Sequence, residues 1–580
     1  MARITLKFMK NILSLSVPFF WLLSFFFSLP LVQPYELSRF LAVLCALHAA
    51  VIVIGSPANR GVRLSMNRPV FFMLAFSVWL GLSFFWSVSP FVTIISWGSF
   101  LLLPLWFLIF VYAPFDHDQL LVSLRLFVGA LTALAAWGLI QFFILPEYLS
   151  TYGSIRHPFA DPNNFAGLLN MGMFVALGLF LYERQKPYAV LYVMAGIAMA
   201  MVMILIGSRV ALAVMIVTAL FMMLVCRFAR HNDYKMGFGP LLLLTAVIVA
   251  TFLLSSIYNL ERVTAWERLT HMVLLLKDPS WLARMDIWAS TITLIRENIW
   301  QGTGLGTFFL LYPSVRHDTE VFSAGLMAHA DPLQFWQEAG LPAVLLFYAF
   351  LIVMLGRFIG AWRTAPRFGN VYILIVALFC GLLTLVMHLH LTFHLYVPAL
   401  LTATGLLAGL FVRLSTNETQ TSRTVSMPLV GHIFLLLIGG FMVAYSSCLY
   451  SERMADLATE RLAANDLEGF SDAVNRAGKA GFGLNPRPYV LAATIPLGLI
   501  QIGRMPESER IALFSQTNDL LERSLARSPI NPGAYYAKAL LFGAMKRPGF
   551  EDYLALTLKY DPQHPQAGAL QKAVEGHPQP

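Results

Sequence analysis

Three ionisable side chains lie at the edges of long apolar segments, where they could do chemistry: Arg209, Arg284 and His329. Ionisable groups in such places are costly to bury and are usually tied to function. The planar guanidinium group of arginine suits a phosphate, and an imidazole can serve as a general base near neutral pH. The three residues therefore indicate a site for an anionic ligand with a base beside it.

Each arginine also has a structural interpretation. Arg209 lies between two apolar segments with no acidic residue near it in sequence, and it could anchor a helix end by extending toward water. Arg284 lies near the start of an amphipathic segment, where the helix dipole favours anions rather than cations; it could instead pair with Asp286 or Glu297. The neighbouring arginines, such as Arg316 beside Glu320, are expected to form solvated ion pairs.

His329 stands where a long polar loop returns to an apolar segment, and Asp331 and Glu338 follow it. A single histidine is more often structural than catalytic. Glu338 would lie about two and a half turns down the following helix and face the protein interior. Both a catalytic and a structural role are open for this group of residues.

Two further patterns are weaker. His390 and His394 are four residues apart and close to His388, but without a carboxylate or cysteine among them an interface or cavity lining is favoured over a metal site. The Gly-rich segment 302–306 lacks the lysine of a phosphate-binding loop and is predicted to be a tight turn. We expect no metal and no cofactor.

These residues must be positioned by membrane helices. The chain has 580 residues, of which 58% are hydrophobic and 12% charged, against about 25% charged residues in soluble domains. About thirteen apolar spans are long enough to cross a bilayer, which excludes an ordinary cytosolic enzyme. The predicted fold is all-α, a polytopic transmembrane helical bundle. The predicted spans are centred near residues 21, 46, 78, 103, 133, 173, 197, 218, 249, 345, 380, 404 and 438.

The net charge of +9 belongs entirely to residues 1–448, because residues 449–580 carry 14 basic and 14 acidic side chains. No basic nucleic-acid domain is present. The basic residues gather in alternate loops, which predicts a cytoplasmic N-terminus on a retained first helix. The four cysteines lie in or at the ends of apolar segments, so a disulfide framework is not expected.

Two domains are predicted. Residues 1–448 form the transmembrane domain, including an outer loop over 259–330 with an amphipathic stretch from Trp281 to Trp300 that would lie at the membrane interface. Residues 449–580 form an outer tail in which Pro-containing boundaries recur at a spacing of 33. This period resembles tetratricopeptide repeats. The alternative is a plain helical hairpin domain.

Several short motifs in this order resemble the O-antigen ligase and polymerase superfamily, over about residues 20–412. The motifs are Trp86-Ser87-Val88-Ser89-Pro90, the segment 159–167 around Asp161, Asn163 and Asn164, Gly207-Ser208-Arg209, Arg284 with Ile287-Trp288, the segment 302–308, and His329 with Glu338-Ala339-Gly340.

The resemblance implies a metal-independent glycosyltransferase of the bacterial inner membrane. It would take a glycan from an undecaprenyl-diphosphate carrier on the periplasmic side and move it to an acceptor hydroxyl. Arg209 and Arg284 would hold the diphosphate, and His329 would be the base or orienting group. Glu338, Asp331 and Asn163 are expected to bind substrate. Asp331 replaces an amide or hydroxyl of many members and would either tune His329 or cap the next helix.

The acceptor is open. It could be lipid A core (a ligase), a growing chain (a polymerase) or a protein hydroxyl (an oligosaccharyltransferase), and the tail could bind a protein partner. Two other classes are alternatives. A secondary transporter would show repeated halves and broken helices near the midplane, neither of which the sequence indicates. A scaffold protein would bind a protein partner through its tail, and its membrane part would be inert.

Overall fold

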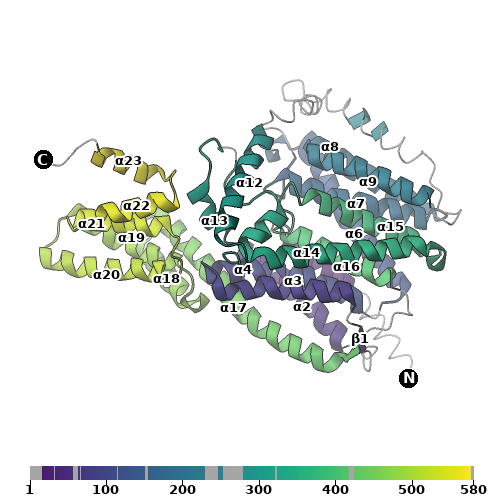
Figure 1. Ribbon diagram of the computed structural model, residues 1–580, viewed down its shortest axis with the longest axis horizontal. Coiled ribbons are helices and arrows are strands. Elements are labelled where there is room, and N and C mark those ends of the chain that lie inside the picture. Colours follow the sequence, from purple (N-terminus) through teal and green to yellow (C-terminus); the bar gives the residue numbers. More distant parts are fainter. Residues whose placement is uncertain are drawn as a thin grey trace.

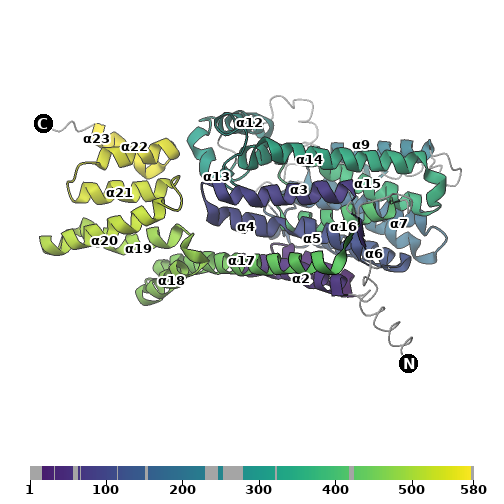
Figure 2. The ribbon, with the colours of Figure 1, turned by 60° about the horizontal axis from the view of Figure 1, so that its bottom comes forward.

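The computed structural model is an all-α polytopic helical bundle with a helical tail, as the sequence predicts (Figure 1). It describes residues 16–575 except 32, 56–62, 66, 114, 150–154, 229–245, 248, 252–278, 321–322 and 417–423. Figure 2 shows the membrane helices lying side by side, with the tail helices beyond one end of them. We call this end of the bundle the tail end.

The helices of the bundle follow the apolar segments. They are α2 (Tyr35–Gly55), α3 (Arg68–Leu82), α4 (Pro90–Phe100), α5 (Leu102–Tyr112), α6 (His117–Phe143), α7 (Pro162–Tyr182), α8 (Val190–Ile206), α9 (Arg209–Arg227), α12 (Pro279–Glu297), α13 (Phe308–Leu311), α14 (Asp331–Arg363), α15 (Val371–His388), α16 (Pro398–Leu414) and α17 (Met427–Ala463).

Ten stretches in the described part of the chain are long and apolar enough to span a membrane, and Ser16–Ser28 and Pro398–Leu414 are shorter apolar helices. These twelve match twelve of the thirteen predicted spans. The thirteenth, near residue 249, lies largely outside the described residues.

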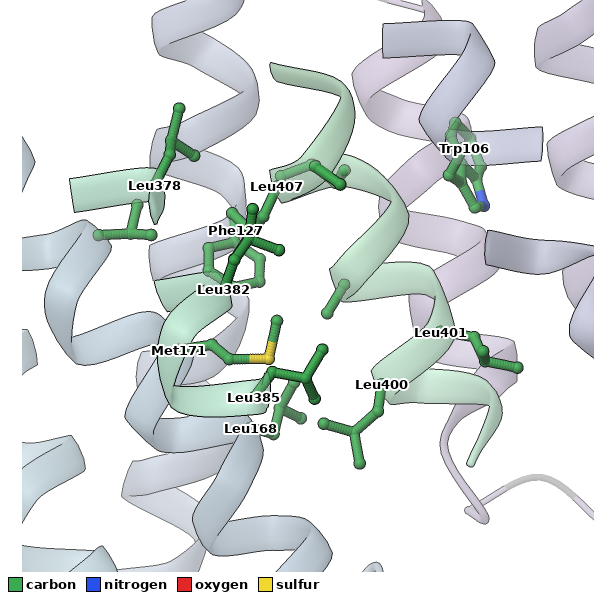
Figure 3. Packing of buried hydrophobic residues seen from close by; sticks show 14 of the residues in the cluster. Trp106, Phe127, Leu168, Met171, Leu378, Leu382, Leu385, Leu400, Leu401 and Leu407 are labelled. Carbon is green, nitrogen blue, oxygen red and sulfur yellow. The ribbon is translucent and has the colours of Figure 1, made fainter. Parts of the chain in front are cut away.

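The core lies where helices with apolar residues on every side meet. Figure 3 shows Phe127, Leu168, Leu385 and Leu407 packed together there. Small residues let backbones approach closely in membrane helices. A Cβ atom on Gly405 or Gly409 of α16 would lie only 2.7 or 2.6 Å from a backbone oxygen of α5, so these glycines allow α16 and α5 to pack closely.

Contacts at the end of the bundle opposite the tail join several segments that were predicted to lie on the same side of the membrane. Arg125 forms an ion pair of 2.5 Å with Glu183. Arg413 donates to the carbonyl oxygens of Ala113 and Phe115. The short strands β1 (Arg63–Ser65) and β2 (Thr424–Ser426) pair antiparallel. These contacts concern only the described parts of the predicted cytoplasmic segments, and the side of the membrane that they face stays a prediction.

Helix α14 is broken near the tail end, which the sequence analysis did not predict. Gly340 has φ 75° and ψ −179°, and Pro342 follows it. The chain of Trp300 and Gln301 passes so close that a Cβ atom on Gly340 would lie 2.1 Å from the Trp300 carbonyl oxygen. The break thus admits the segment that follows α12.

Helix α17 runs without interruption from the bundle into the tail, so the boundary predicted between residues 448 and 449 falls inside a helix. The tail helices are α18 (Leu467–Lys479), α19 (Arg487–Ile502), α20 (Glu507–Leu525), α21 (Pro532–Ala544), α22 (Phe550–Tyr560) and α23 (Pro565–Glu575), with the 3₁₀ turn η9 (Gly481–Gly483) before α19.

The recurring Pro-containing segments of the tail fall between helices. The segment 528–532 separates α20 from α21, where the side chain of Asn531 accepts a hydrogen bond from Ala534 N. The segment 560–565 separates α22 from α23. Neighbouring helices pack on one another, and α22 also contacts η7 (Tyr312–Val315) of the long loop. A likeness to tetratricopeptide repeats stays a prediction.

Candidate active site

A cavity of about 870 Å³ opens at the tail end of the bundle, between the start of α7, the turn from α8 to α9, α12 and the end of α15. Its wall includes Asn163, Arg209, Arg284 and His329. Four of the six predicted site residues therefore meet at one cavity, although they come from four separate parts of the chain.

The Gly-Ser-Arg motif places Arg209 by ending one helix and starting the next. Gly207 adopts φ 75° and ends α8, a backbone conformation that glycine adopts without penalty. Ser208 caps α9, where its Oγ accepts from Ala211 N at 3.2 Å. Arg209 is then the first residue of α9. Its positive charge and the helix N-terminus are both at the cavity wall, and both favour an anion.

A chain of hydrogen bonds joins this motif to the start of α7. The Ser208 hydroxyl donates to Asn163 Oδ1 at 2.7 Å. Asp161 Oδ1 accepts from the backbone and side-chain amides of Asn163 at 2.7 and 2.9 Å. Asn163 thus lines the cavity as predicted and also holds the two motifs together.

Arg284 lies on the second turn of α12. Its Nη1 donates to Ser280 Oγ at 2.9 Å, and both side chains line the cavity. The predicted amphipathic stretch forms most of this helix. Ile287 and Ile295 are buried, whereas Met285 and Ile292 are more than 40% exposed.

His329 is held in a strained backbone conformation. Its φ is 51°, in the left-handed region that residues other than glycine rarely adopt. Its ring lies edge-on against Phe393 at 5.1 Å between centroids. Among the described residues, Nδ1 of His329 has no hydrogen-bond partner.

Hydrogen bonds on both sides of His329 hold the strained backbone. The Ala328 carbonyl accepts from Trp288 Nε1 at 3.1 Å, and Ala328 N donates to Gln334 Oε1 at 2.9 Å. After the histidine, Asp331 N donates to the Leu389 carbonyl at 2.9 Å. Such over-determined strain is typical of functional sites.

Burial lowers the pKa of His329 below the usual histidine value. The negative charge of Asp161 opposes this shift, and the positive charge of Arg284 adds to it. The net direction favours the neutral imidazole. The ring can therefore accept a proton at neutral pH.

Asp331 does not reach the cavity wall, contrary to the prediction that it binds substrate. It is fully buried, and its Oδ2 accepts from His394 N at 2.9 Å and Leu395 N at 2.8 Å. The residue that caps α14 is Ala330. Asp331 therefore ties α14 to the chain after α15, and neither predicted alternative describes it.

Glu338 faces the interior, as its position on the helix predicted, but it lines no part of the cavity. Its carboxylate accepts from Gly306 N at 2.7 Å, Gln334 Nε2 at 3.0 Å and the Tyr396 hydroxyl at 2.8 Å, with Phe308 N at 3.3 Å. These hydrogen bonds tie α14 to the glycine turn before α13 and to Tyr396.

The Gly-rich segment is a tight turn, as predicted. Gly302, Gly304 and Gly306 have φ of 68°, 108° and 81°, and a Cβ atom on Gly302 would meet the backbone of Glu338 at 2.4 Å. The turn presents amides to an anion, but that anion is the carboxylate of Glu338.

The three histidines at the end of α15 and just beyond it do not share one site. His390 bonds to Tyr348 and to the Val386 carbonyl, whereas His388 and His394 are buried with their rings 4.5 Å apart. His394 Nδ1 is 2.9 Å from Asn164 Oδ1. In the described part of the chain no group of three potential ligands could hold a metal.

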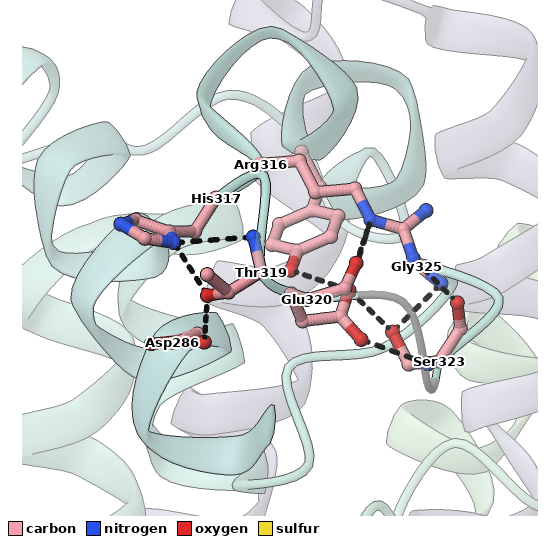
Figure 4. A network of polar contacts seen from close by, with 8 residues as sticks. Asp286, Arg316, His317, Thr319, Glu320, Ser323 and Gly325 are labelled. Carbon is pink, nitrogen blue, oxygen red and sulfur yellow. Dashed lines mark hydrogen bonds and ion pairs between the residues drawn. The ribbon is translucent and has the colours of Figure 1, made fainter. Parts of the chain in front are cut away.

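A polar network beside the cavity fixes the long loop (Figure 4). Glu320 is fully buried and pairs with Arg316 at 2.9 Å, so this pair is not solvated as predicted. Glu320 also accepts from Ser323 N at 2.8 Å and from the Tyr312 hydroxyl at 3.1 Å. The network holds Ser323 at the cavity wall.

Other residues of the cavity wall were not predicted from the sequence. Ser208 carried a signal, because a serine before a helical segment is a common cap. Ser280, Trp281 and Ser323 carried none, since only the folding of the long loop brings them to the wall.

Residues 194–348 match the model of the family described as O-antigen ligase, Wzy_C. The matched range contains Arg209, Arg284, His329 and Glu338, and it supports the O-antigen ligase superfamily that the motifs indicate. The comparison with curated proteins finds no match.

Proposed function

Starting from the similarity of residues 194–348 to O-antigen ligases, we propose that the protein transfers a glycan from an undecaprenyl-diphosphate carrier to an acceptor hydroxyl. The observation that carries this proposal is that the cavity has two chemically different ends. One end holds cationic and polar groups, and the other follows an apolar helix face into the bundle.

The apolar end suits a lipid chain. Val210, Ala213, Val214 and Val217 line it at the spacing of one face of α9, and Met387 of α15 joins them. These α9 residues extend about 10 Å along a helix that is itself a candidate membrane span. Val217 is 48% exposed, so this face is open to the surroundings of the helix. A polyprenyl chain could reach the cavity from the bilayer.

The polar end suits a diphosphate. The guanidinium groups of Arg209 and Arg284 line the same wall, together with the N-terminus of α9. Guanidinium groups bind phosphate oxygens in a planar fork. When a lipid diphosphate departs, negative charge develops on it, and positioned cations stabilise that charge in the transition state.

The chemistry follows from these positions. The acceptor hydroxyl attacks the anomeric carbon of the glycan, a new carbon–oxygen bond forms, and the bond to the carrier phosphate breaks. The diphosphate leaves with the electron pair of that bond, next to Arg209 and Arg284. The hydroxyl proton passes to the neutral imidazole of His329. The hydrogen-bonded chain from Asp161 through Asn163 to Ser208 positions Arg209.

The acceptor is lipid A core, a growing chain or a protein, with surface-polysaccharide ligation as the first choice. We further propose that the protein lies in a bacterial inner membrane with a cytoplasmic N-terminus and a periplasmic tail over residues 449–580. A tail of stacked, repeat-like helices would offer an extended surface to a bulky acceptor or a protein partner. Its contact with η7 supports a role close to the long loop.

The test compares the two cavity arginines with Arg296, an exposed arginine on the same helix as Arg284. Arg209→Ala and Arg284→Ala should each lower glycan transfer by about two orders of magnitude or more, as expected when one transition-state contact is lost. Arg296→Ala, on the exposed face of α12, should leave transfer unchanged. Each variant is expressed in cells that lack the native gene, and transfer is measured from the glycan ladders of these cells on gels.

The same gels identify the acceptor. Loss of ladder bands from lipid A core indicates a ligase, a single-repeat band a polymerase, and an unglycosylated protein an oligosaccharyltransferase. Normal glycans in both cavity variants, at normal protein levels, would contradict the enzyme proposal.

A further inference from the structure

The exposed face of α17 marks where the membrane ends beside the tail. Its exposed apolar residues recur at helical spacing and are Ile433, Leu436, Leu437, Val443 and Tyr450. From Ile433 to Tyr450 a helix rises about 25 Å, which is close to the roughly 30 Å of a bilayer's hydrocarbon core. Ser451, Glu452 and Arg453 follow directly. The membrane boundary therefore lies near Tyr450.

The turn η9 of the tail packs against α17 at this level. Gly481 N donates to Ser447 Oγ at 2.9 Å, and Ser451 Oγ donates to the Ala477 carbonyl at 2.8 Å. The next residue of the tail, Leu484, packs against the cluster formed by Phe91 and Ile94 of α4 and Cys448 of α17. Two separate membrane helices therefore hold η9 at the boundary.

The same turn carries an exposed aromatic side chain. Phe482 is 65% exposed, and its φ is 53° between Gly481 at 61° and Gly483 at 65°. A left-handed backbone is unfavourable for phenylalanine and is retained only where the surroundings impose it. In water, an exposed phenylalanine ring makes no contact that would offset the free-energy cost of this backbone conformation. At a membrane boundary, phenylalanine is among the apolar residues that interfacial segments bury between the headgroups and the acyl chains.

We propose that Phe482 is a membrane anchor, whose ring enters the headgroup and upper acyl region of the phospholipid bilayer beside the end of α17. The partner is phospholipid, because the exposed lipid-facing stripe of α17 ends at the level of η9. The anchor fixes the base of the tail on the membrane, while α22 contacts η7 further out. This inference does not depend on the proposed glycan transfer.

Photo-crosslinking tests the proposal without altering the native cysteines. Phe482→p-benzoylphenylalanine keeps an aromatic ring in place, and the full chain is irradiated in nanodiscs of phosphatidylethanolamine and phosphatidylglycerol. Val443→p-benzoylphenylalanine is the lipid-facing reference. Ile511→p-benzoylphenylalanine, on an exposed residue of α20, is the water-facing reference. Intact mass spectrometry detects the added mass of a phospholipid.

The variant at residue 482 should form lipid adducts at a yield similar to that at 443 and about tenfold or more above that at 511. All three proteins must elute as single species of the same size, which confirms folding. A yield at 482 equal to that at 511, with adducts present at 443, would overturn the proposal. If substitution at 482 disturbs folding, the folded Phe482→Trp variant is used instead, and the quenching of its tryptophan fluorescence by brominated lipids is measured. The Phe482→Leu variant gives the quenching of the native tryptophans alone. Greater quenching in Phe482→Trp supports the proposal, and equal quenching would overturn it.

Discussion

The histidine of the cavity combines three properties that a base requires. His329 lies beside two arginines that also line the cavity, its Nδ1 lacks a partner within the described residues, and packing lowers its pKa. Its left-handed backbone costs of the order of 1–3 kcal/mol. The hydrogen bonds of Ala328 and Asp331, on either side of His329, stabilise this strained conformation.

The lowered pKa of His329 sets the sign of the pH dependence. Only the neutral imidazole accepts a proton, so transfer should be full at neutral pH and fall as the pH drops through a pKa below the ordinary 6.5. The measurement is the initial rate of transfer in proteoliposomes between pH 4.5 and 8. In His329→Asn, which tolerates a left-handed backbone, the residual rate should lose this acidic limb. A limb centred above pH 6.5 in the native protein would contradict the assignment.

Glu338 is predicted to matter for folding rather than for binding. In Glu338→Gln an amide with two donors would face the backbone amides of Gly306 and Phe308 and the hydroxyl of Tyr396. Each buried group left unsatisfied costs about 1–3 kcal/mol, so the melting temperature in detergent should fall by several degrees. Glu297→Gln, on the exposed end of α12, should melt like the native protein.

At the scale of single elements, the break in α14 and the turn of glycines before α13 fit each other. Because Gly340 has no side chain, the backbone of Trp300 and Gln301 can pass close to it, and Gly302 in turn lies close to the backbone of Glu338. Leu341 N, beyond the break, donates to the Ile299 carbonyl at 2.9 Å. The two backbones therefore supply each other's hydrogen bonds where a regular helix would have excluded this approach.

Substitution of Gly340 should therefore be far more damaging than substitution of another glycine in the same helix. In Gly340→Ala the new Cβ atom would lie 2.1 Å from the Trp300 carbonyl oxygen, on a backbone with φ 75°. Gly356→Ala meets nothing within 4 Å and should be neutral or stabilising by about 0.5–1 kcal/mol. The amount of folded, monodisperse protein after membrane extraction is the measurement. Equal yields of the two variants would contradict this role of the break.

The sequence could identify Arg209, Arg284 and His329 because charge is scarce in an apolar chain, and each charged boundary residue is conspicuous. It could not show that Asp331 and Glu338 turn inward. Their partners lie far along the chain, 63 residues away at His394 and 32 at Gly306. A carboxylate near a candidate base looks the same in sequence whether it faces a ligand or a backbone amide.

At the scale of the whole molecule, the apolar pattern predicted the fold class and most spans, but not where the bundle meets the tail. Helix α17 keeps its hydrogen bonding while its composition changes from apolar to polar. A composition change therefore locates the membrane boundary near Leu449, and the helix itself ends only at Ala463.

Two truncations separate these boundaries. A chain that ends after Ala463 keeps the complete span, so it should insert into the membrane, keep its bundle and lose only functions of the tail. A chain that ends before Leu449 retains Met427 to Cys448 but loses Leu449, whose side chain is buried in the core of the bundle; it should accumulate at several-fold lower levels. Immunoblots of membrane fractions compare the two. Equal levels would show that α17 beyond Cys448 adds nothing to the bundle.

The link between Asp331 and the backbone of His394 and Leu395 also orders events during biosynthesis. When the ribosome has made the chain as far as His329, the residues Arg209, Arg284 and His329 have all been translated. The backbone of His394 and Leu395, which binds Asp331, has not. At about 5–20 residues per second, several seconds pass before the turn after α15 emerges. A nascent chain therefore inserts before the candidate site is assembled, and the proposed transfer should begin only after the segment that follows α15 has been made.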